Sequence, residues 1–389
     1  MIGSVVVNGR EYRLPGQPTV VFTIDGGDPR YLDDALDRGL MPNLRTLLVD
    51  GGVAARGRGC MPSLTNPNNL SIVTGVAPSL HGVPGNHYLD PGSGEELQLN
   101  DPRFLRAGTV HAALQSVGAR VLMVTAKDKL RRLLGSGDVP SVSAERASTL
   151  GLPRFGIDRV CDVVGRPNPG IYDWELSHYA MEIGLAVHRR ARLDLLYVSL
   201  TDYVQHKEPP GGGMADAFFC RFDEWLGAYV REGFLIGITA DHGMNAKPRV
   251  IYLEDVLERA GMHDARVVLP ITDPYVVHHG ALGSFAWVHV DAAQLSRARD
   301  AIAALDGIAA VQIGTTDHAR TSVPTVEKGM RQDEGFFAGL LIVEALDEAS
   351  LRSALRQAAE MTPDLFGGIG EPEIYQGMFA IDARIASVE

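Results

Sequence analysis

The sequence is poor in cysteine, in net positive charge and in long apolar runs. Its three cysteines, Cys60, Cys161 and Cys220, form no CxxC pair, so thiolate zinc sites and thiol redox motifs are not expected. The formal net charge of -12 argues against nucleic acid or an anionic membrane surface as the main partner. It is compatible with a local positive pocket for a small anion. No apolar run is long enough to span a bilayer.

The same scarcity bears on the compartment and on the domain organisation. A sparse, odd set of cysteines is typical of a reducing cytoplasm, and residues 1–17 lack a charged head followed by an apolar run. We therefore expect a cytoplasmic protein without a signal peptide. The chain of 389 residues exceeds a usual single domain, so we expect two domains, or one large core with an added cap.

The stretch from residue 60 to residue 75 begins as turn chemistry and ends as a predicted helix. Its Ser, Asn and Pro residues fit the first turn of a helix, where backbone N–H groups have no internal partner. A hydroxyl placed there meets free N–H donors and the positive end of the helix dipole, which together favour an anion. We place Thr65 at this position. The alternative is that Ser63 and Thr65 only cap the helix.

Three predicted buried strands each end in an aspartate, and two of these aspartates have a histidine nearby. Because the carboxyl ends of parallel strands meet at one edge of an open α/β sheet, the carboxylates should converge there. Converging carboxylates repel unless a cation lies between them. The pattern predicts a metal site whose oxygen and nitrogen ligands fit zinc, with manganese or iron left open. The strands and the residues after them are 19–24 with Asp25, 193–200 with Asp202 and His206, and 234–239 with Asp241 and His242.

Other polar residues could hold an anionic substrate. Lys127 and Lys129 leave the predicted strand 119–124 together and could clamp an anion, although such lysines are more often solvated surface groups. Asn86 lies in a predicted loop, where it could reach a bound anion or only hold the turn. For Asp25, the alternative to a metal ligand is a cap on the following helix.

The rest of the chain predicts an α/β core followed by a smaller α+β domain. Asn8-Gly9 indicates a hairpin turn. Residues 135–173 are predicted to form a segment without regular secondary structure. From residue 284 the predicted elements follow the order β-α-β-β-α-β, which is that of a ferredoxin-like unit. We predict a core at 1–280 and a second domain at 281–389 that acts either as a lid or as a dimerisation module. In the second case the protein would form a homodimer. The helices predicted in the core are 40–48, 110–117, 174–192 and 214–230, and the elements predicted in the second domain are 284–290, 292–305, 308–314, 339–345, 348–361 and 373–382.

Several stretches closely resemble the phosphonoacetate hydrolases of the alkaline phosphatase superfamily. The run from Met61 to Asn69 and the run from Ile271 to Gly280 are long and specific, and the resemblance covers roughly the first three quarters of the chain. It implies an alkaline-phosphatase-like α/β fold, with a mostly parallel sheet flanked by helices, and two Zn²⁺ ions. The resembling stretches are 21–26, 60–75, 124–134, 201–207, 239–244 and 269–285.

The resemblance also implies a reaction and a role for each site residue. The reaction is zinc-dependent hydrolysis of the carbon–phosphorus bond of phosphonoacetate, to acetate and phosphate, through a phospho-threonine intermediate. Thr65 resembles the family's nucleophile. The implied first zinc site is Asp25, Thr65, Asp241 and His242, the implied second zinc site includes Asp202 and His206, and the implied substrate-binding groups are Thr65, Asn86, Lys127 and Lys129.

The chain departs from the family pattern at the last expected ligand of the second zinc. The family supplies this ligand from a Ser-His-Gly-Gly segment near the C-terminus, but the nearest match here, 365–368, has Phe366 in place of the histidine. Phenylalanine cannot bind a metal. His278 or His279 is the alternative ligand, although the family carries these residues in addition to its usual one.

Two other functions therefore stay open beside the phosphonoacetate reaction. The first is a phosphodiesterase or phosphomonoesterase of the same superfamily, for which the substrate would need no carboxylate. The second is a catalytically weak homologue that binds phosphonates or acts as a scaffold.

Overall fold

The computed structural model describes residues 3–90, 93–135, 137–170, 173–245, 263, 266–269, 285, 287–289, 308–315 and 339–345. The chain divides into two compact units. The first unit comprises residues 1–86, 98–246 and 271–277, and the second comprises residues 87–97, 247–270 and 278–389. The domain boundary that the sequence suggests near residue 280 stays a prediction.

The first unit is built on a five-stranded parallel sheet in the order β7-β6-β8-β3-β9. Strands β6 and β8 are buried along their whole length, as expected where helices cover both faces of a parallel sheet. The strands predicted for β3, β6, β8 and β9 are confirmed, whereas β7 lies in a segment expected to be irregular. The five strands are β3 (Thr19–Ile24), β6 (Val121–Thr125), β7 (Ser141–Ser143), β8 (Leu195–Ser199) and β9 (Leu235–Ala240).

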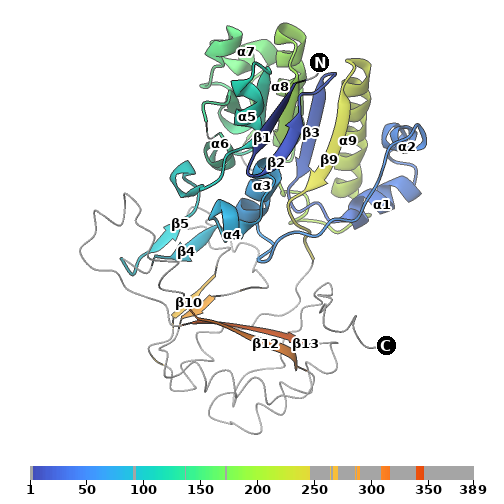
Figure 1. Cartoon of the computed structure of the whole chain (residues 1–389). Coiled ribbons are helices and arrows are strands. Elements are labelled where there is room, and N and C mark those ends of the chain that lie inside the picture. The colour runs from blue at the N-terminus through green and yellow to red at the C-terminus, as the bar shows by residue number, and fades with distance from the viewer. Residues whose placement is uncertain are drawn as a thin grey trace, which may run out of the picture. The chain divides into compact units, whose positions relative to one another are not determined.

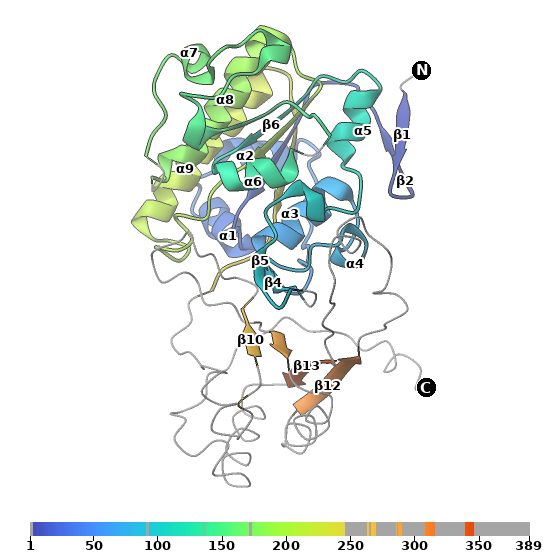
Figure 2. The same cartoon turned by 90° about the vertical axis from the view of Figure 1, so that its left-hand side faces the viewer.

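Helices cover both faces of this sheet (Figures 1 and 2). On one face, Phe22 of β3 meets the rings of Phe222 and Tyr229 of α9 (Gly213–Arg231) edge-on, with ring centroids 5.6 and 5.1 Å away. Helix α8 (Glu175–Ala191) packs on β6 and β8 and contacts α9. On the other face, Tyr197 of β8 contacts His111 of α5 (Val110–Ser116) and donates a hydrogen bond to Asn69 of α3 (Thr65–Thr74).

Shorter elements complete the first unit. The predicted hairpin is confirmed, with β1 (Ser4–Val7) antiparallel to β2 (Arg10–Arg13) and both turn residues, Asn8 and Gly9, at positive φ. The remaining helices and 3-10 turns are α1 (Pro29–Asp37), α2 (Pro42–Val49), α4 (Pro78–His81), η1 (Pro102–Phe104), α6 (Asp128–Leu134), η2 (Ala144–Arg146), η3 (Pro153–Phe155) and α7 (Val160–Val164).

The described part of the second unit consists of short strand pairs. Strand β10 (Arg266–Val268) is antiparallel to β11 (Trp287–His289), and β12 (Ile308–Thr315) is antiparallel to β13 (Gly339–Ala345). Strand β4 (His87–Leu89) pairs with β5 (Glu96–Gln98).

The strands predicted at 284–290, 308–314 and 339–345 are confirmed in position. The predicted helices 292–305 and 348–361 and the predicted strand 373–382 lie outside the described residues. None of the helices that the structure describes has the length and apolar character needed to cross a membrane.

Candidate functional site

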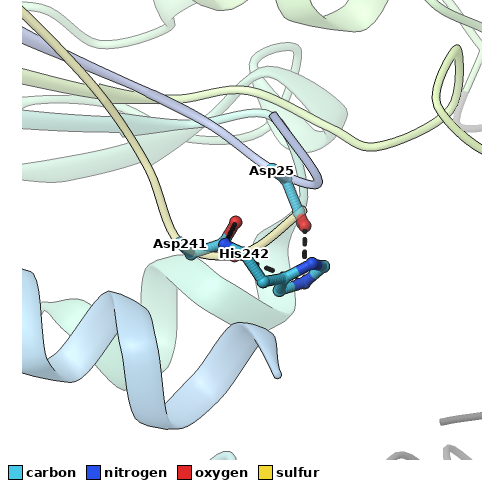
Figure 3. Close-up of side chains that lie close together, drawn as sticks. All are labelled: Asp25, Asp241 and His242. Carbon is cyan, nitrogen blue, oxygen red and sulfur yellow. Dashed lines mark hydrogen bonds and ion pairs between the residues drawn. The ribbon is translucent and has the colours of Figure 1, made fainter. Parts of the chain in front are cut away.

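Two aspartates and a histidine meet where β3 and β9 end (Figure 3). Asp25 follows β3, and Asp241 and His242 follow β9, the neighbouring parallel strand, in which Ala240 pairs with Ile24. One ligand atom from each of the three side chains lies within 4.8 Å of the others. The structure thus brings together two of the three predicted strand ends, because a parallel sheet delivers adjacent strand ends to one edge, whereas Asp202 and His206, which follow β8, do not join this group.

The electrostatics of this cluster favour a bound cation. Burial, followed by repulsion from Asp241 and Asp202, raises the pKa of Asp25 well above its ordinary value. Burial also raises the pKa of Asp241, although His242 opposes this change. Two buried carboxylates that resist ionisation in each other's presence are the arrangement that a metal ion relieves.

The tautomer of His242 supports the same conclusion. Its Nδ1 lies 3.0 Å from the carbonyl oxygen of Gly243, which can only accept, so we assign the proton of the neutral ring to Nδ1. The lone pair of Nε2 then faces Asp25 Oδ1 at 3.3 Å and Asp241 Oδ2 at 3.8 Å. Moreover, the buried Asp25 Oδ1 accepts no hydrogen bond from any residue that the structure describes. The donor set therefore fits zinc, which takes nitrogen and oxygen ligands.

Backbone groups hold the Asp241 carboxylate in place. Its Oδ1 accepts hydrogen bonds from Gly26 N at 3.2 Å and from His242 N at 2.8 Å. Gly26 has a φ of +66°, a left-handed conformation that glycine adopts without a steric penalty. The alternative role of Asp25 as a helix cap is wrong, because the cap of α1 is Asp28, whose carboxylate accepts from Arg30 N.

Thr65 is the first residue of α3, and its hydroxyl points toward the cluster. The N-cap residue is Leu64, which makes no side-chain cap, and Thr65 Oγ1 lies 3.2 Å from His242 Nε2. With the proton of His242 on Nδ1, the hydroxyl of Thr65 donates to Nε2. The geometry therefore favours a chemical role for this hydroxyl over the capping role that the sequence left open.

Asn69, which sequence reasoning missed, connects this helix to the cluster. Its Nδ2 donates to Asp241 Oδ2 at 2.8 Å and to the carbonyl of Thr65 at 3.1 Å. Its Oδ1 accepts from the hydroxyl of Tyr197 at 3.0 Å, which in turn accepts from Thr23 Oγ1 at 2.8 Å. The available signal was the run of asparagines in a predicted helix, because asparagine is a poor residue for a helix interior.

Asn86 holds the start of α3. Its Oδ1 accepts a hydrogen bond of 2.9 Å from the backbone N–H of Asn66, one of the first N–H groups of the helix. The structure thus places Asn86 beside Thr65 in a turn-holding contact. Its contact with a bound anion stays a prediction.

Asp202 and His206 form a pair, joined by Lys127. Asp202 Oδ2 lies 2.9 Å from His206 Nε2, and Asp202 Oδ1 lies 3.2 Å from Lys127 Nζ. Burial alone would raise the pKa of Asp202, but the hydrogen bond with His206 and the charge of Lys127 outweigh burial and hold that pKa well below its ordinary value. Across the described ranges, no third histidine, cysteine or carboxylate joins the pair to form a closed metal-binding group.

The candidates for the last ligand of the predicted second zinc are not among the residues that the structure describes. Phe366, His278 and His279, on which the sequence-based alternatives rest, all lie outside them. The completion of a second zinc site therefore stays a prediction.

The two lysines follow β6 at the same end of the sheet. Lys127 is exposed and Lys129 is half-buried, and Asp128 between them is buried. The contact of Lys127 with Asp202 connects the lysine turn to the predicted second zinc ligands.

Comparison with known proteins shows which family the chain matches and which solved structures it resembles. Residues 19–334 match the model of the family "Type I phosphodiesterase / nucleotide pyrophosphatase". The chain is also similar to phosphonoacetate hydrolase from Sinorhizobium meliloti 1021. It is 41% identical to the structure of that enzyme with phosphonoformate, with a TM-score of 0.77 over 89% of this chain and 85% of the other. It is 40% identical to the structure with phosphonoacetate, with a TM-score of 0.75 over 90% and 87% of the two chains.

More distant proteins share the fold or a short segment. The alkaline phosphatase PafA is 16% identical, with a TM-score of 0.53 over 84% of this chain and 85% of the other, which is a likeness of fold alone. An uncharacterized pyrophosphatase/phosphodiesterase of Schizosaccharomyces pombe is 35% identical over 83 residues. That match spans 21% of this chain and only 16% of the relative.

Proposed function

Because the chain belongs to the type I phosphodiesterase / nucleotide pyrophosphatase family, we propose that it is a zinc-dependent phosphonoacetate hydrolase. The fold is alkaline-phosphatase-like, with a parallel sheet flanked by helices. Similarity to a phosphonoacetate hydrolase over most of both chains supports the choice of substrate. The observation that carries the proposal is the contact of Thr65 Oγ1 with His242 Nε2 beside two buried carboxylates.

The first metal would be held by Asp25, Asp241 and His242, with Thr65 as the remaining ligand. These side chains present oxygen and nitrogen atoms and no thiolate, which suits zinc. When bound, zinc supplies a Lewis acid that lowers the pKa of a hydroxyl and stabilises negative charge on phosphoryl oxygens. Asp202 and His206 would contribute to a second zinc site.

Thr65 would be the nucleophile. Its hydroxyl lies at the start of α3, with Oγ1 3.2 Å from His242 Nε2, the ring nitrogen that would hold the metal. In the first step Thr65 releases its hydroxyl proton to water and its oxygen forms a bond to phosphorus. The carbon–phosphorus bond breaks at the same time, and the electron pair of that bond leaves with the carbon. Protonation of the resulting carbanion gives acetate, and water then cleaves the phospho-threonine to release phosphate.

Lys127 and Lys129 would recognise the carboxylate of the substrate. Two ammonium groups at the sheet edge offset the charge of a substrate that carries both a carboxylate and a phosphonate. Electron density that builds on the acetate carbon spreads into its carboxylate, so Lys129 is also suited to stabilise the leaving group. Asn86, which lies beside Asn66 at the start of α3, would contact the phosphonate oxygens.

A second candidate function is a phosphodiesterase or phosphomonoesterase. It is favoured by the family model, whose description names phosphodiesterase activity, and it would use the same nucleophile and metal ligands. Such substrates carry no carboxylate, so a phosphodiesterase or phosphomonoesterase function does not explain the presence of Lys127 and Lys129.

Phosphate release from phosphonoacetate tests the proposal. Purified protein is assayed with added zinc, with a chelator, and with zinc restored after chelation, alongside a panel of phosphate mono- and diesters. Zinc-dependent release from phosphonoacetate supports the proposal, and turnover of the esters alone replaces it with the second function. Turnover of neither class, despite bound zinc, would indicate a protein that binds phosphonates without hydrolysing them.

A further inference from the structure

Asp128 is a buried carboxylate placed between the two lysines. Its side chain is 8% exposed, whereas Lys127 on one side is exposed and Lys129 on the other is half-buried. A lone aspartate among basic residues next to an anion-binding turn would weaken anion binding through its charge. The structure gives this aspartate a full set of partners instead.

Both oxygens of Asp128 are engaged. Oδ1 accepts from Arg131 Nε at 2.6 Å and from Ser143 Oγ at 2.8 Å, and Oδ2 accepts from Arg132 Nε at 3.2 Å. Oδ2 also lies 3.6 Å from Arg146. Although burial alone would raise the pKa of Asp128, the bonds from Arg131 and Ser143 lower it, so the carboxylate is ionised and held from α6, β7 and η2.

The backbone around Asp128 is held as firmly as its side chain. Asp128 N donates to Glu145 Oε2 at 2.8 Å, and the carbonyl of Lys127 accepts from Thr125 Oγ1 at 2.8 Å. The carbonyl of Ala126 accepts from Glu145 N at 3.1 Å. The turn from residue 125 to residue 128 is therefore fixed at successive peptide groups, with Lys127 immediately before the start of α6 and Lys129 in its first turn.

We propose that Asp128 is a positioning residue, which holds Lys127 and Lys129 toward the substrate and so sets the preference for a carboxylate-bearing phosphonate. The inference rests on the proposed function for the identity of the substrate. Asp128 acts through the lysines and does not itself contact the substrate. Fixing the lysines in advance lowers the conformational entropy that they lose when the anion binds.

The direction in which Asp128→Asn changes the dissociation constant distinguishes a positioning role of Asp128 from a purely electrostatic one. Removal of the negative charge of Asp128 makes the turn more positive, so simple electrostatics predicts tighter binding of any anion. Positioning predicts weaker binding, and only for a ligand whose carboxylate uses the lysines. Asp128→Asn removes the charge with little change in shape, so it distinguishes the two accounts.

The experiment measures dissociation constants by calorimetry in zinc-loaded protein, with phosphonoacetate and with methylphosphonate, which lacks the carboxylate. For Asp128→Asn we expect the dissociation constant of phosphonoacetate to rise about tenfold and that of methylphosphonate to change less than about twofold. Ser143→Ala removes one bond to Asp128 and leaves its charge, so it should shift the phosphonoacetate constant in the same direction by about two- to threefold. It also serves as the test should Asp128→Asn fail to fold.

The matched control is Asp223→Asn. Asp223 is also buried and accepts from backbone N–H groups of Asn43 and Leu44, so its loss reports the general cost of a buried Asp→Asn change. The inference is overturned if Asp223→Asn reproduces the effect, if both ligands weaken alike, or if Asp128→Asn binds phosphonoacetate more tightly. Because binding is measured directly, absence of turnover in the wild-type protein would reject the proposed function without deciding this test.

Discussion

The side-chain amide of Asn69 donates to Asp241 Oδ2 at 2.8 Å and so joins the helix of the predicted nucleophile to a predicted metal ligand. The same amide group donates to the carbonyl of Thr65, and its oxygen accepts from Tyr197. A partner that orients a ligating carboxylate commonly changes metal affinity by about 10- to 100-fold when it is lost. We therefore expect Asn69 to support the predicted metal site.

We predict that Asn69→Ala weakens zinc binding by about 10- to 100-fold. The buried Asp241 would lose the donor to its Oδ2, whereas the backbone donors to its Oδ1 remain. Zinc affinity is measured by competition with a chromogenic chelator. Asn100→Ala, which removes only a bond to Gln98, is the control and should leave affinity unchanged. Equal affinity in both variants would mean that Asn69 does not support the metal site.

Thr65→Ala should abolish turnover and leave the fold intact. The side chain is half-buried at a helix start and makes no cap, so its loss costs little packing. Thr65→Ser keeps the hydroxyl beside His242 and should retain measurable activity. Phosphate release and the circular dichroism spectrum are compared for both variants. Near wild-type activity in Thr65→Ala would remove Thr65 as the nucleophile.

Lys127→Ala and Lys129→Ala should each lower kcat/KM for phosphonoacetate by at least about tenfold, because each removes a charge-assisted contact with the carboxylate. Hydrolysis of an aryl phosphate ester, which lacks that carboxylate, should change much less. Lys207→Ala, at an exposed lysine whose ammonium lies 5.8 Å from the ring centroid of Tyr203, is the control. Undiminished turnover of phosphonoacetate in both lysine variants would contradict the substrate assignment.

The strand-end residues were predictable from the sequence because their placement depends on a general rule. A parallel sheet brings the carboxyl ends of its strands to one edge, so Asp25 and Asp241 could be placed at that edge without the strand order. Their close approach also requires that β3 and β9 be neighbours, which only the structure shows. The helix start at Thr65 followed similarly from local turn chemistry. The ligand atoms of Asp25, Asp241 and His242 meet at this edge as predicted, whereas Asp202 does not join them.

Contacts that depend on strand order and packing could not be predicted in this way. The bond from Tyr197 to Asn69 joins residues 128 positions apart, and it exists only because α3 packs on the face of the sheet that Tyr197 occupies. Strand β7 was missed because three residues, Ser141–Ser143, are too short to show a periodic pattern. The anchoring of Asp128 depends on that strand, since Ser143 supplies one of its hydrogen bonds.

His178 should make the stability of the protein sensitive to acid. Its ring is fully buried against Trp174 and Phe218. Neither ring nitrogen has a hydrogen-bond partner in the described part of the chain. Burial, with a smaller effect of Arg221, lowers the pKa of His178 from 6.5 to about 3. Below pH 6.5 the unfolded chain takes up a proton that the folded chain does not, so the free energy of unfolding falls as the pH falls, whereas above pH 6.5 this residue has no effect. We predict that His178→Phe removes about 2 kcal/mol of the stability lost between pH 7 and pH 5, as measured by urea unfolding. His263→Phe, at an exposed histidine, should keep the wild-type dependence, and an unchanged dependence in His178→Phe would show that other groups cause the acid sensitivity.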